Sequence, residues 1–227
     1  MAKKTASAVS GGRPAPSPPI TWPTINAEPG LELERLSQDL IIVDGFFSRQ
    51  TLKTWRTFLP TINMSPPAPA QKGYAARFND RFGVQAPDFA RNLYEKSGLK
   101  ELCEAGIESG VKGKRPVGLN PNIRLYKYEE GAYFGPHYDD DFFDPSTRQR
   151  SEWTLLIYLT GVEDGVVGGE TAFYPSANTK RDGAALSVPL VAGRALLHRH
   201  GHACMLHEGR KVGKGTKWVL RSDVMFA

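Results

Sequence analysis

The stretch NIRLYKYEEGAYFGPHYD, residues 122–139, contains two runs of aliphatic and aromatic residues on either side of a glycine-containing turn. Similar runs follow it to the end of the chain: WTLLIYLT (153–160), TAFYP (171–175), ALSVPL (185–190), RALLHRH (194–200) and TKWVLRSDVMF (216–226). Short strands at this spacing are typical of β-sandwiches and barrels. The sequence therefore predicts a jelly-roll, cupin-like core over about residues 120–227.

The part of the chain before this core has helical patterns. LIIVDGFF predicts a short buried strand and a turn, after which Ser48 is placed to cap an amphipathic helix. Pro87 opens a second pattern, DFARNLYEKSGLKELCEAGI, whose apolar residues can line a helical face. We expect helical support over about residues 36–115. The fold class is then mainly β with flanking helices (α+β), in one domain spanning residues 31–227.

The first 30 residues differ in composition from the rest of the chain. They hold six of the 17 prolines among glycines and serines, and this composition favours extended, solvated backbone. We expect residues 1–30 to form a disordered arm. Only two cysteines occur, Cys103 and Cys204, and neither an apolar run of membrane-spanning length nor a secretory signal is visible. These features predict no membrane association and a cytoplasmic or nuclear location.

One short motif carries residues suited to metal binding. His137 and Asp139 are two positions apart, so in a strand their side chains point to the same face. His207 in LHEG is the leading candidate for a third ligand. Two histidines and one carboxylate leave coordination positions open, as non-haem Fe(II) requires for a cosubstrate and oxygen. His198, His200 and His202 alternate along RALLHRHGH and form a rival set, although structural or wall roles are favoured for them.

Five ordered motifs extend this pattern: YEEGAYFGPHYD, WTLLIYLT, GGETAFYP, VAGRALL and HEGRKVGKGTKWVLRSD. In order and spacing they resemble the prolyl-4-hydroxylase-like branch of the 2-oxoglutarate and Fe(II) dependent dioxygenases. The resemblance covers roughly residues 122–226. It implies a double-stranded β-helix, iron on His137, Asp139 and His207, and 2-oxoglutarate and O2 as cosubstrates. It also implies release of succinate and CO2, with ascorbate as an optional reductant.

The resemblance further implies a set of residues that hold 2-oxoglutarate. Tyr128 matches the position whose phenol reaches the cosubstrate, and Thr171 of GGET offers a hydroxyl. Lys217 follows His207 at the family's usual separation and is expected to bind the far carboxylate. Arg221 lies on the same strand face as Lys217 and competes for this role.

The expected activity is hydroxylation of an organic substrate, either a prolyl or other side chain of a peptide or protein, or a small molecule. The formal charge of +5 is spread along the chain, which disfavours nucleic acid as a partner. An AlkB-type nucleic-acid demethylase and a non-catalytic jelly-roll binding module are the alternatives. The segment ARFNDRF, residues 76–82, has the polar content of a substrate-recognition strand or lid, or of a salt-bridged surface. The sequence carries no signal for an oligomeric state.

Overall fold

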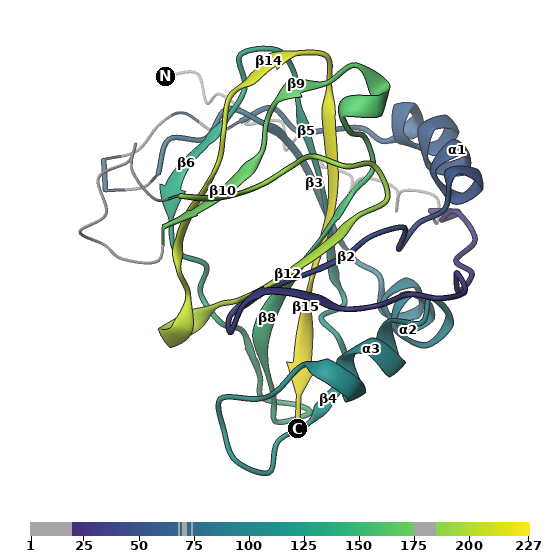
Figure 1. Ribbon diagram of the computed structural model, residues 1–227, viewed down its shortest axis with the longest axis vertical. Coiled ribbons are helices and arrows are strands. Elements are labelled where there is room, and N and C mark those ends of the chain that lie inside the picture. The colour runs from purple at the N-terminus through teal and green to yellow at the C-terminus, as the bar shows by residue number, and fades with distance from the viewer. Residues whose placement is uncertain (1–19, 68, 70–71, 74, 175–184) are drawn as a thin grey trace, which may run out of the picture.

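The computed structural model describes residues 20–67, 69, 72–73, 75–174 and 185–227. Two facing β-sheets form its centre, and the three α-helices lie together on one side of the larger sheet (Figure 1). The predicted fold class, a jelly-roll with flanking helices, is confirmed by this arrangement. No helix in the described part of the chain is long and apolar enough to cross a membrane.

The larger sheet has the strand order β1-β2-β12-β8-β15-β5-β3, with β4 paired to β15 and β7 paired to β8. Its central strands are antiparallel neighbours that come from distant parts of the sequence, such as β8 and β15. The strands are β1 (Glu34–Ser37), β2 (Leu40–Val43), β3 (Asp80–Gln85), β4 (Pro116–Leu119), β5 (Asn122–Tyr128), β7 (Phe143–Asp144), β8 (Gln149–Tyr158), β12 (Ala195–Arg199) and β15 (Lys217–Phe226).

The smaller sheet has the order β11-β10-β13-β6, and a separate pair joins β14 to β9. Both sheets are needed for the site, because β6 and β13 belong to the smaller one and β12 and β15 to the larger one. The strands are β6 (Phe134–His137), β10 (Thr171–Tyr174), β11 (Leu186–Val188), β13 (Leu206–Gly209), β9 (Val167–Gly168) and β14 (Val212–Lys214).

The helices are α1 (Arg49–Phe58), α2 (Pro87–Lys96) and α3 (Leu99–Gly106), with 3-10 turns η1 (Leu59–Thr61), η2 (Val162–Asp164) and η3 (Gly201–Ala203). Ser48 caps α1 as predicted, because its side chain accepts a hydrogen bond from the Thr51 amide. The helical pattern expected after Pro87 forms two helices. Gly98 has a φ of 83°, a left-handed conformation that ends helical hydrogen bonding and divides the segment into α2 and α3.

Side chains on the two faces of the larger sheet enter two separate cores. Leu125 and Leu220 pack with Trp55 and Leu93 of the helices, on the outer face. On the same two strands, Tyr126 and Val219 instead join the core between the sheets. This alternation follows from the two-residue period of a strand, and it aims every second side chain of β5 and β15 at the space between the sheets.

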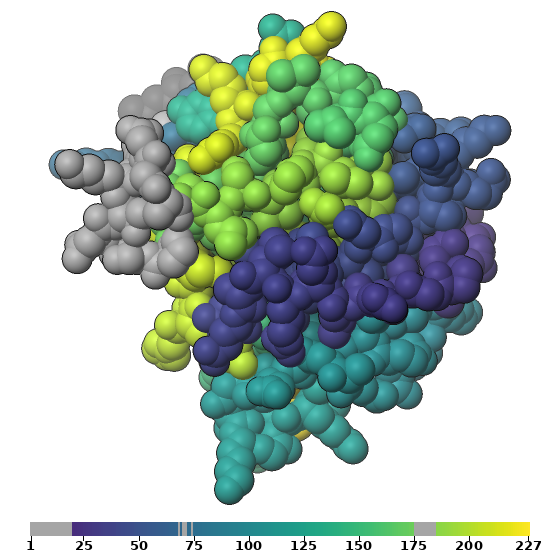
Figure 2. Space-filling model, in the orientation of Figure 1, coloured from purple at the N-terminus to yellow at the C-terminus, as the bar shows by residue number. Residues whose placement is uncertain are grey.

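The region before the jelly-roll differs from the expectation in two respects. It supplies β1, β2 and β3 to the larger sheet in addition to its helices. Within residues 20–30 two side chains pack on the domain, which corrects the expected limit of the arm: Ile25 is 6% exposed, and the Trp22 ring stacks on Phe89 with centroids 4.2 Å apart. Figure 2 shows this purple segment lying against the teal helical region. The rest of the expected arm, residues 1–19, lies outside the described residues.

Candidate metal and cosubstrate site

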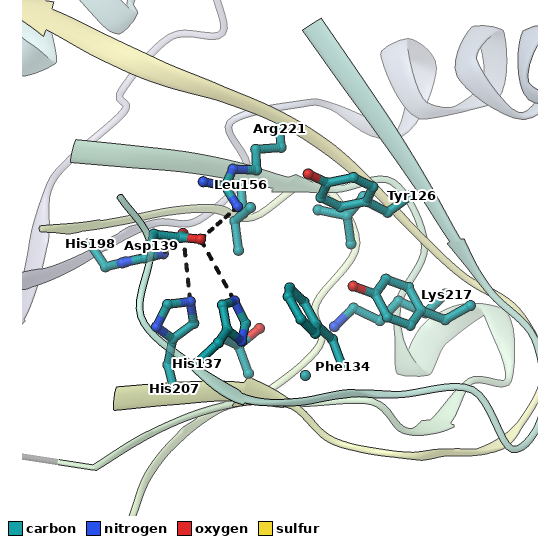
Figure 3. Close-up of a pocket in the computed structure, with 13 residues that line it drawn as sticks. Tyr126, Phe134, His137, Asp139, Leu156, His198, His207, Lys217 and Arg221 are labelled. Atoms are coloured by element: carbon teal, nitrogen blue, oxygen red, sulfur yellow. Dashed lines mark hydrogen bonds and ion pairs between the residues drawn. The ribbon is translucent and has the colours of Figure 1, made fainter. Parts of the chain in front are cut away.

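Two neighbouring strands place two histidines beside each other. His137 ends β6, His207 lies on β13, and the two residues are antiparallel partners in the small sheet. Asp139 lies two residues after the end of β6, and its carboxylate lies 3.7 Å from Nε2 of His137 and 3.6 Å from Nε2 of His207. The three ligand atoms all lie within 4.8 Å of one another, close enough to share one cation (Figure 3).

Backbone carbonyls orient both imidazoles. Nδ1 of His137 lies 2.8 Å from the Gly135 carbonyl oxygen, and Nδ1 of His207 lies 3.0 Å from that of Met205. A carbonyl can only accept, so Nδ1 of each ring carries a proton and Nε2 is the atom that faces Asp139. Nε2 is therefore the ring atom placed to bind a metal.

Asp139 is held in place from two directions. Arg221 donates to Oδ1 at 2.9 Å, and the Thr154 hydroxyl donates to Oδ2 at 3.0 Å. Thr154 in turn lies 2.9 Å from Nδ1 of His200, whose Nε2 lies 2.9 Å from the Ser151 hydroxyl. Both ring nitrogens of His200 are therefore engaged, which gives it the structural role expected and removes it as a candidate ligand.

Two of the three candidate ligands have the protonation state that a cation requires, and the third, His207, holds a proton that a cation would displace. Burial and the neighbouring His207 lower the pKa of His137 to about 3, so its ring is neutral at pH 7. Burial disfavours charge on Asp139, but Arg221 and His207 outweigh it and hold that pKa well below its usual value. Burial also opposes charge on His207, yet hydrogen bonds with Asp139 and Cys204 raise its pKa to about 9. A divalent cation between His207 and Asp139 would take the place of that proton.

His198, on β12, lies at the same point although the sequence favoured a structural or wall role for it. Its side chain is 1% exposed, and Nε2 lies 3.6 Å from Oδ2 of Asp139. Within the described residues, this Nε2 has no hydrogen-bond partner. His198, Cys204 and His207 form a second possible metal-binding group, which shares His207 with the first. The alternating histidines of RALLHRHGH were the sequence signal for this contact.

The residues expected to hold 2-oxoglutarate gather on the other side of the same pocket. Lys217 on β15 is paired with Tyr128 on β5, and its Nζ lies 5.0 Å from the Tyr128 ring centroid. Thr171 shares a 2.7 Å hydrogen bond with the Tyr158 hydroxyl. Lys217 is 3% exposed and donates to the Gly169 carbonyl at 2.6 Å. This face offers a cation and hydroxyl groups to an anionic ligand.

Lys217 and Arg221 differ in their partners. Lys217 has no carboxylate within ion-pair distance in the described chain, and burial lowers its pKa to about 8 despite the opposing charge of Glu170. Arg221 is bound to Asp139 and lies 3.6 Å from Asp223. Figure 3 shows Arg221 beside Asp139 and Lys217 across the pocket from it. Of these two residues, Lys217 is the one without a carboxylate partner in the described chain.

The fold and site together define a class of protein: a jelly-roll with a buried group of two imidazoles and a carboxylate, and a buried lysine facing it. That donor set suits non-haem Fe(II) and leaves coordination positions free. Residues 123–222 match the family model of the 2OG-Fe(II) oxygenase superfamily, and the jelly-roll region of this chain belongs to that superfamily. The match spans β5 to β15 and includes every candidate ligand. No curated protein matches the chain significantly.

Solved structures share the fold at low sequence identity. A viral collagen prolyl hydroxylase from Paramecium Bursaria Chlorella virus-1 is 18% identical with a TM-score of 0.56, covering 83% of this chain and 96% of that one. A Pseudomonas putida prolyl-4-hydroxylase is 16% identical (TM-score 0.55; 82% and 92% covered). A Trichoplax adhaerens prolyl hydroxylase, solved with a hypoxia inducible factor peptide fragment, is 15% identical (TM-score 0.58; 83% and 84% covered).

Proposed function

We propose that this 2-oxoglutarate-dependent dioxygenase hydroxylates a carbon of an organic substrate, with a prolyl or other side chain of a peptide as the first candidate. The observation that carries the proposal is the pocket in which His137, Asp139 and His207 converge opposite Lys217. The peptide candidate is suggested by the Trichoplax structure, which contains a peptide fragment.

In this proposal, His137, Asp139 and His207 hold Fe(II), and Lys217 binds the far carboxylate of 2-oxoglutarate. When bound, iron and 2-oxoglutarate supply the oxidising chemistry, in which O2 is reduced as the keto acid loses CO2 and becomes succinate. Arg221 and Thr154 keep Asp139 ionised and oriented. An ammonium group that is already out of water binds a carboxylate more strongly than an exposed one does.

Other side chains of the pocket fix its shape and exclude water. Thr171 and Tyr128 offer hydroxyls beside Lys217, and both are buried. The Phe134 ring stacks on His137, with centroids 3.6 Å apart, and covers the pocket between His137 and Lys217 (Figure 3). We propose that these residues orient 2-oxoglutarate and keep bulk water from the reacting atoms.

The test is spectroscopic and chemical. Fe(II) is added to the protein under anaerobic conditions, followed by 2-oxoglutarate, and the weak visible charge-transfer band of a chelated keto acid is expected. Admission of air should then yield succinate, measured by mass spectrometry. His207→Ala is the negative control and exposed His202→Ala the matched one. Absence of both band and succinate from the wild-type protein would favour a non-catalytic binding module.

A further inference from the structure

A cavity of about 540 Å³ adjoins the metal pocket. His137, Asp139, Tyr126 and Phe134 line both spaces, so a molecule in the cavity has direct access to the candidate metal ligands. Four arginines also line the cavity: Arg77, Arg81, Arg124 and Arg221. The function of the metal and 2-oxoglutarate does not account for this concentration of positive charge.

Two of these arginines already have carboxylate partners. Arg221 pairs with Asp139 at 2.9 Å, and Arg124 pairs with buried Asp223. Arg221 and Arg124 therefore neutralise buried carboxylates of the protein itself. Their guanidinium groups are therefore not free to pair with a ligand, because each lies against a buried carboxylate.

Arg77 and Arg81 have no carboxylate within ion-pair distance in the part of the chain that the structure describes. Arg77 is held in a fixed position: its guanidinium carbon lies 4.6 Å from the Tyr126 ring centroid and 4.3 Å from that of Phe134. Its Nε donates to the side chain of fully buried Asn79 at 2.8 Å. Its Nη2 is enclosed and has no hydrogen-bond partner among the described residues. Arg77 thus presents a guanidinium at a defined place in the cavity wall, without a carboxylate partner among the described residues.

The electrostatics of the neighbouring groups show a positive field at this place. Burial raises the pKa of Tyr126, yet Arg221, Arg124 and Arg77 outweigh burial, and the pKa lies below its ordinary value. Burial lowers the pKa of Arg81, and Arg77, Arg124 and Arg221 lower it further. Cations that repel one another in this way are stabilised when an anion enters.

We propose that Arg77 and Arg81 form a carboxylate-binding subsite that selects substrates with an acidic group near the carbon to be hydroxylated. This inference rests on the proposed function and names its substrate class. A planar guanidinium matches the two oxygens of a carboxylate. The segment ARFNDRF supplies both arginines, which gives it the substrate-recognition role considered from the sequence.

The shape of the cavity favours one acidic group over a polyanionic strand. Its volume is in the range of small-ligand sites, and Pro67, Pro69 and Ala75 form an apolar part of its wall. A nucleic-acid groove would instead follow the phosphate backbone over several nucleotides, which a cavity of this volume cannot hold. The acidic group can belong to a peptide side chain or to a free organic acid, because the chemistry of recognition is the same.

Two matched pairs of probes separate these sources. The peptides Ac-Gly-Glu-Pro-Gly-NH2 and Ac-Gly-Gln-Pro-Gly-NH2 differ only in charge, as do N-acetylproline and N-acetylprolinamide. Binding is measured by calorimetry on the full chain, and turnover by succinate formed above the substrate-free rate and by gain of one oxygen atom. The variants are Arg77→Gln, Arg81→Lys and Arg81→Glu, with exposed Arg49→Gln on α1 as the matched control.

In the wild type and in Arg49→Gln, the acidic member of at least one pair should bind about tenfold or more tightly than the neutral member. Arg77→Gln should abolish this preference, Arg81→Lys should keep most of it, and Arg81→Glu should reverse it in favour of the neutral member. High salt should weaken the preference.

Several results would overturn the subsite. These are equal affinity for the charged and neutral members of each pair, or no binding of any probe. An unchanged charge preference in Arg77→Gln and Arg81→Glu would also overturn it, as would succinate formation that only an oligonucleotide stimulates. Failure of the proposed function is distinguishable, because it appears as wild-type protein that makes no succinate even without substrate. Charge preference in calorimetry would then still support the subsite as a binding site.

Discussion

Replacement of Lys217 by methionine should change stability and cosubstrate affinity in opposite directions. Burial lowers the pKa of Lys217 from 10.5 to about 8. At about 1.4 kcal/mol per pKa unit, the charged lysine costs the folded protein about 3 kcal/mol at pH 7. The substitution also removes the hydrogen bond to the Gly169 carbonyl, which lowers the free energy of unfolding by about 1 kcal/mol. Lys217→Met should therefore stabilise the protein by about 2 kcal/mol and raise Tm by about 4–8 °C.

The same substitution should weaken binding of 2-oxoglutarate, because the far carboxylate would then be buried without a cation. Breaking a buried ion pair costs about 3 kcal/mol or more, which corresponds to a rise in KM of about a hundredfold. Arg221→Met should affect 2-oxoglutarate less and iron more, since Arg221 is bound to Asp139.

The assay combines thermal unfolding of the metal-free protein with titration of 2-oxoglutarate at saturating iron, followed by succinate formation. Lys127→Met is the control, because that lysine lies on the neighbouring strand and pairs with exposed Glu129. A Lys217→Met protein with unchanged KM, beside an Arg221→Met protein with a greatly raised KM, would reverse the assignment. A lowered Tm for Lys217→Met would refute the argument from burial.

Four further results are expected. His207→Ala should lose bound iron, measured by metal analysis, while its circular dichroism spectrum is unchanged; retained iron and turnover would remove His207 from the ligand set. Thr154→Val removes a hydrogen bond to Asp139 and should weaken iron binding about tenfold to a hundredfold, so wild-type affinity would contradict that support role. The KM for 2-oxoglutarate should rise as pH increases through about 8, where Lys217 loses its proton, and a KM that does not change with pH would count against Lys217. The contribution of Lys217 to the free energy of unfolding should increase between about pH 8 and 10.5, because the unfolded chain binds more protons than the folded protein in that range. Trp22→Ala should lower the free energy of unfolding by about 2 kcal/mol in chemical unfolding, since its ring stacks on Phe89. An unchanged free energy of unfolding would indicate that residues 20–30 form a free arm.

Local pattern was sufficient for much of the fold. Strands β5, β12 and β15 lie within runs whose aliphatic and aromatic content predicted them, and β8 overlaps its run but begins four residues earlier. Ser48 caps α1 because its hydroxyl meets the requirement of the helix start. These features depend on neighbours in sequence. The division of α2 from α3 at Gly98 was missed because a glycine inside an apolar pattern is compatible with either outcome.

The site shows the same division between local and distant information. The sequence by itself determined which residue types could bind a metal and that His137 and Asp139 share one face, since strand geometry has a period of two. Tertiary structure decided the rest. Antiparallel pairing of β6 with β13 brings His207 to His137, and packing of the two sheets brings His198 and Arg221 to Asp139. Arg77 reaches Tyr126 and Phe134 by the same packing. Such contacts join residues that are distant in sequence, so they depend on strand order and register, which no local pattern encodes.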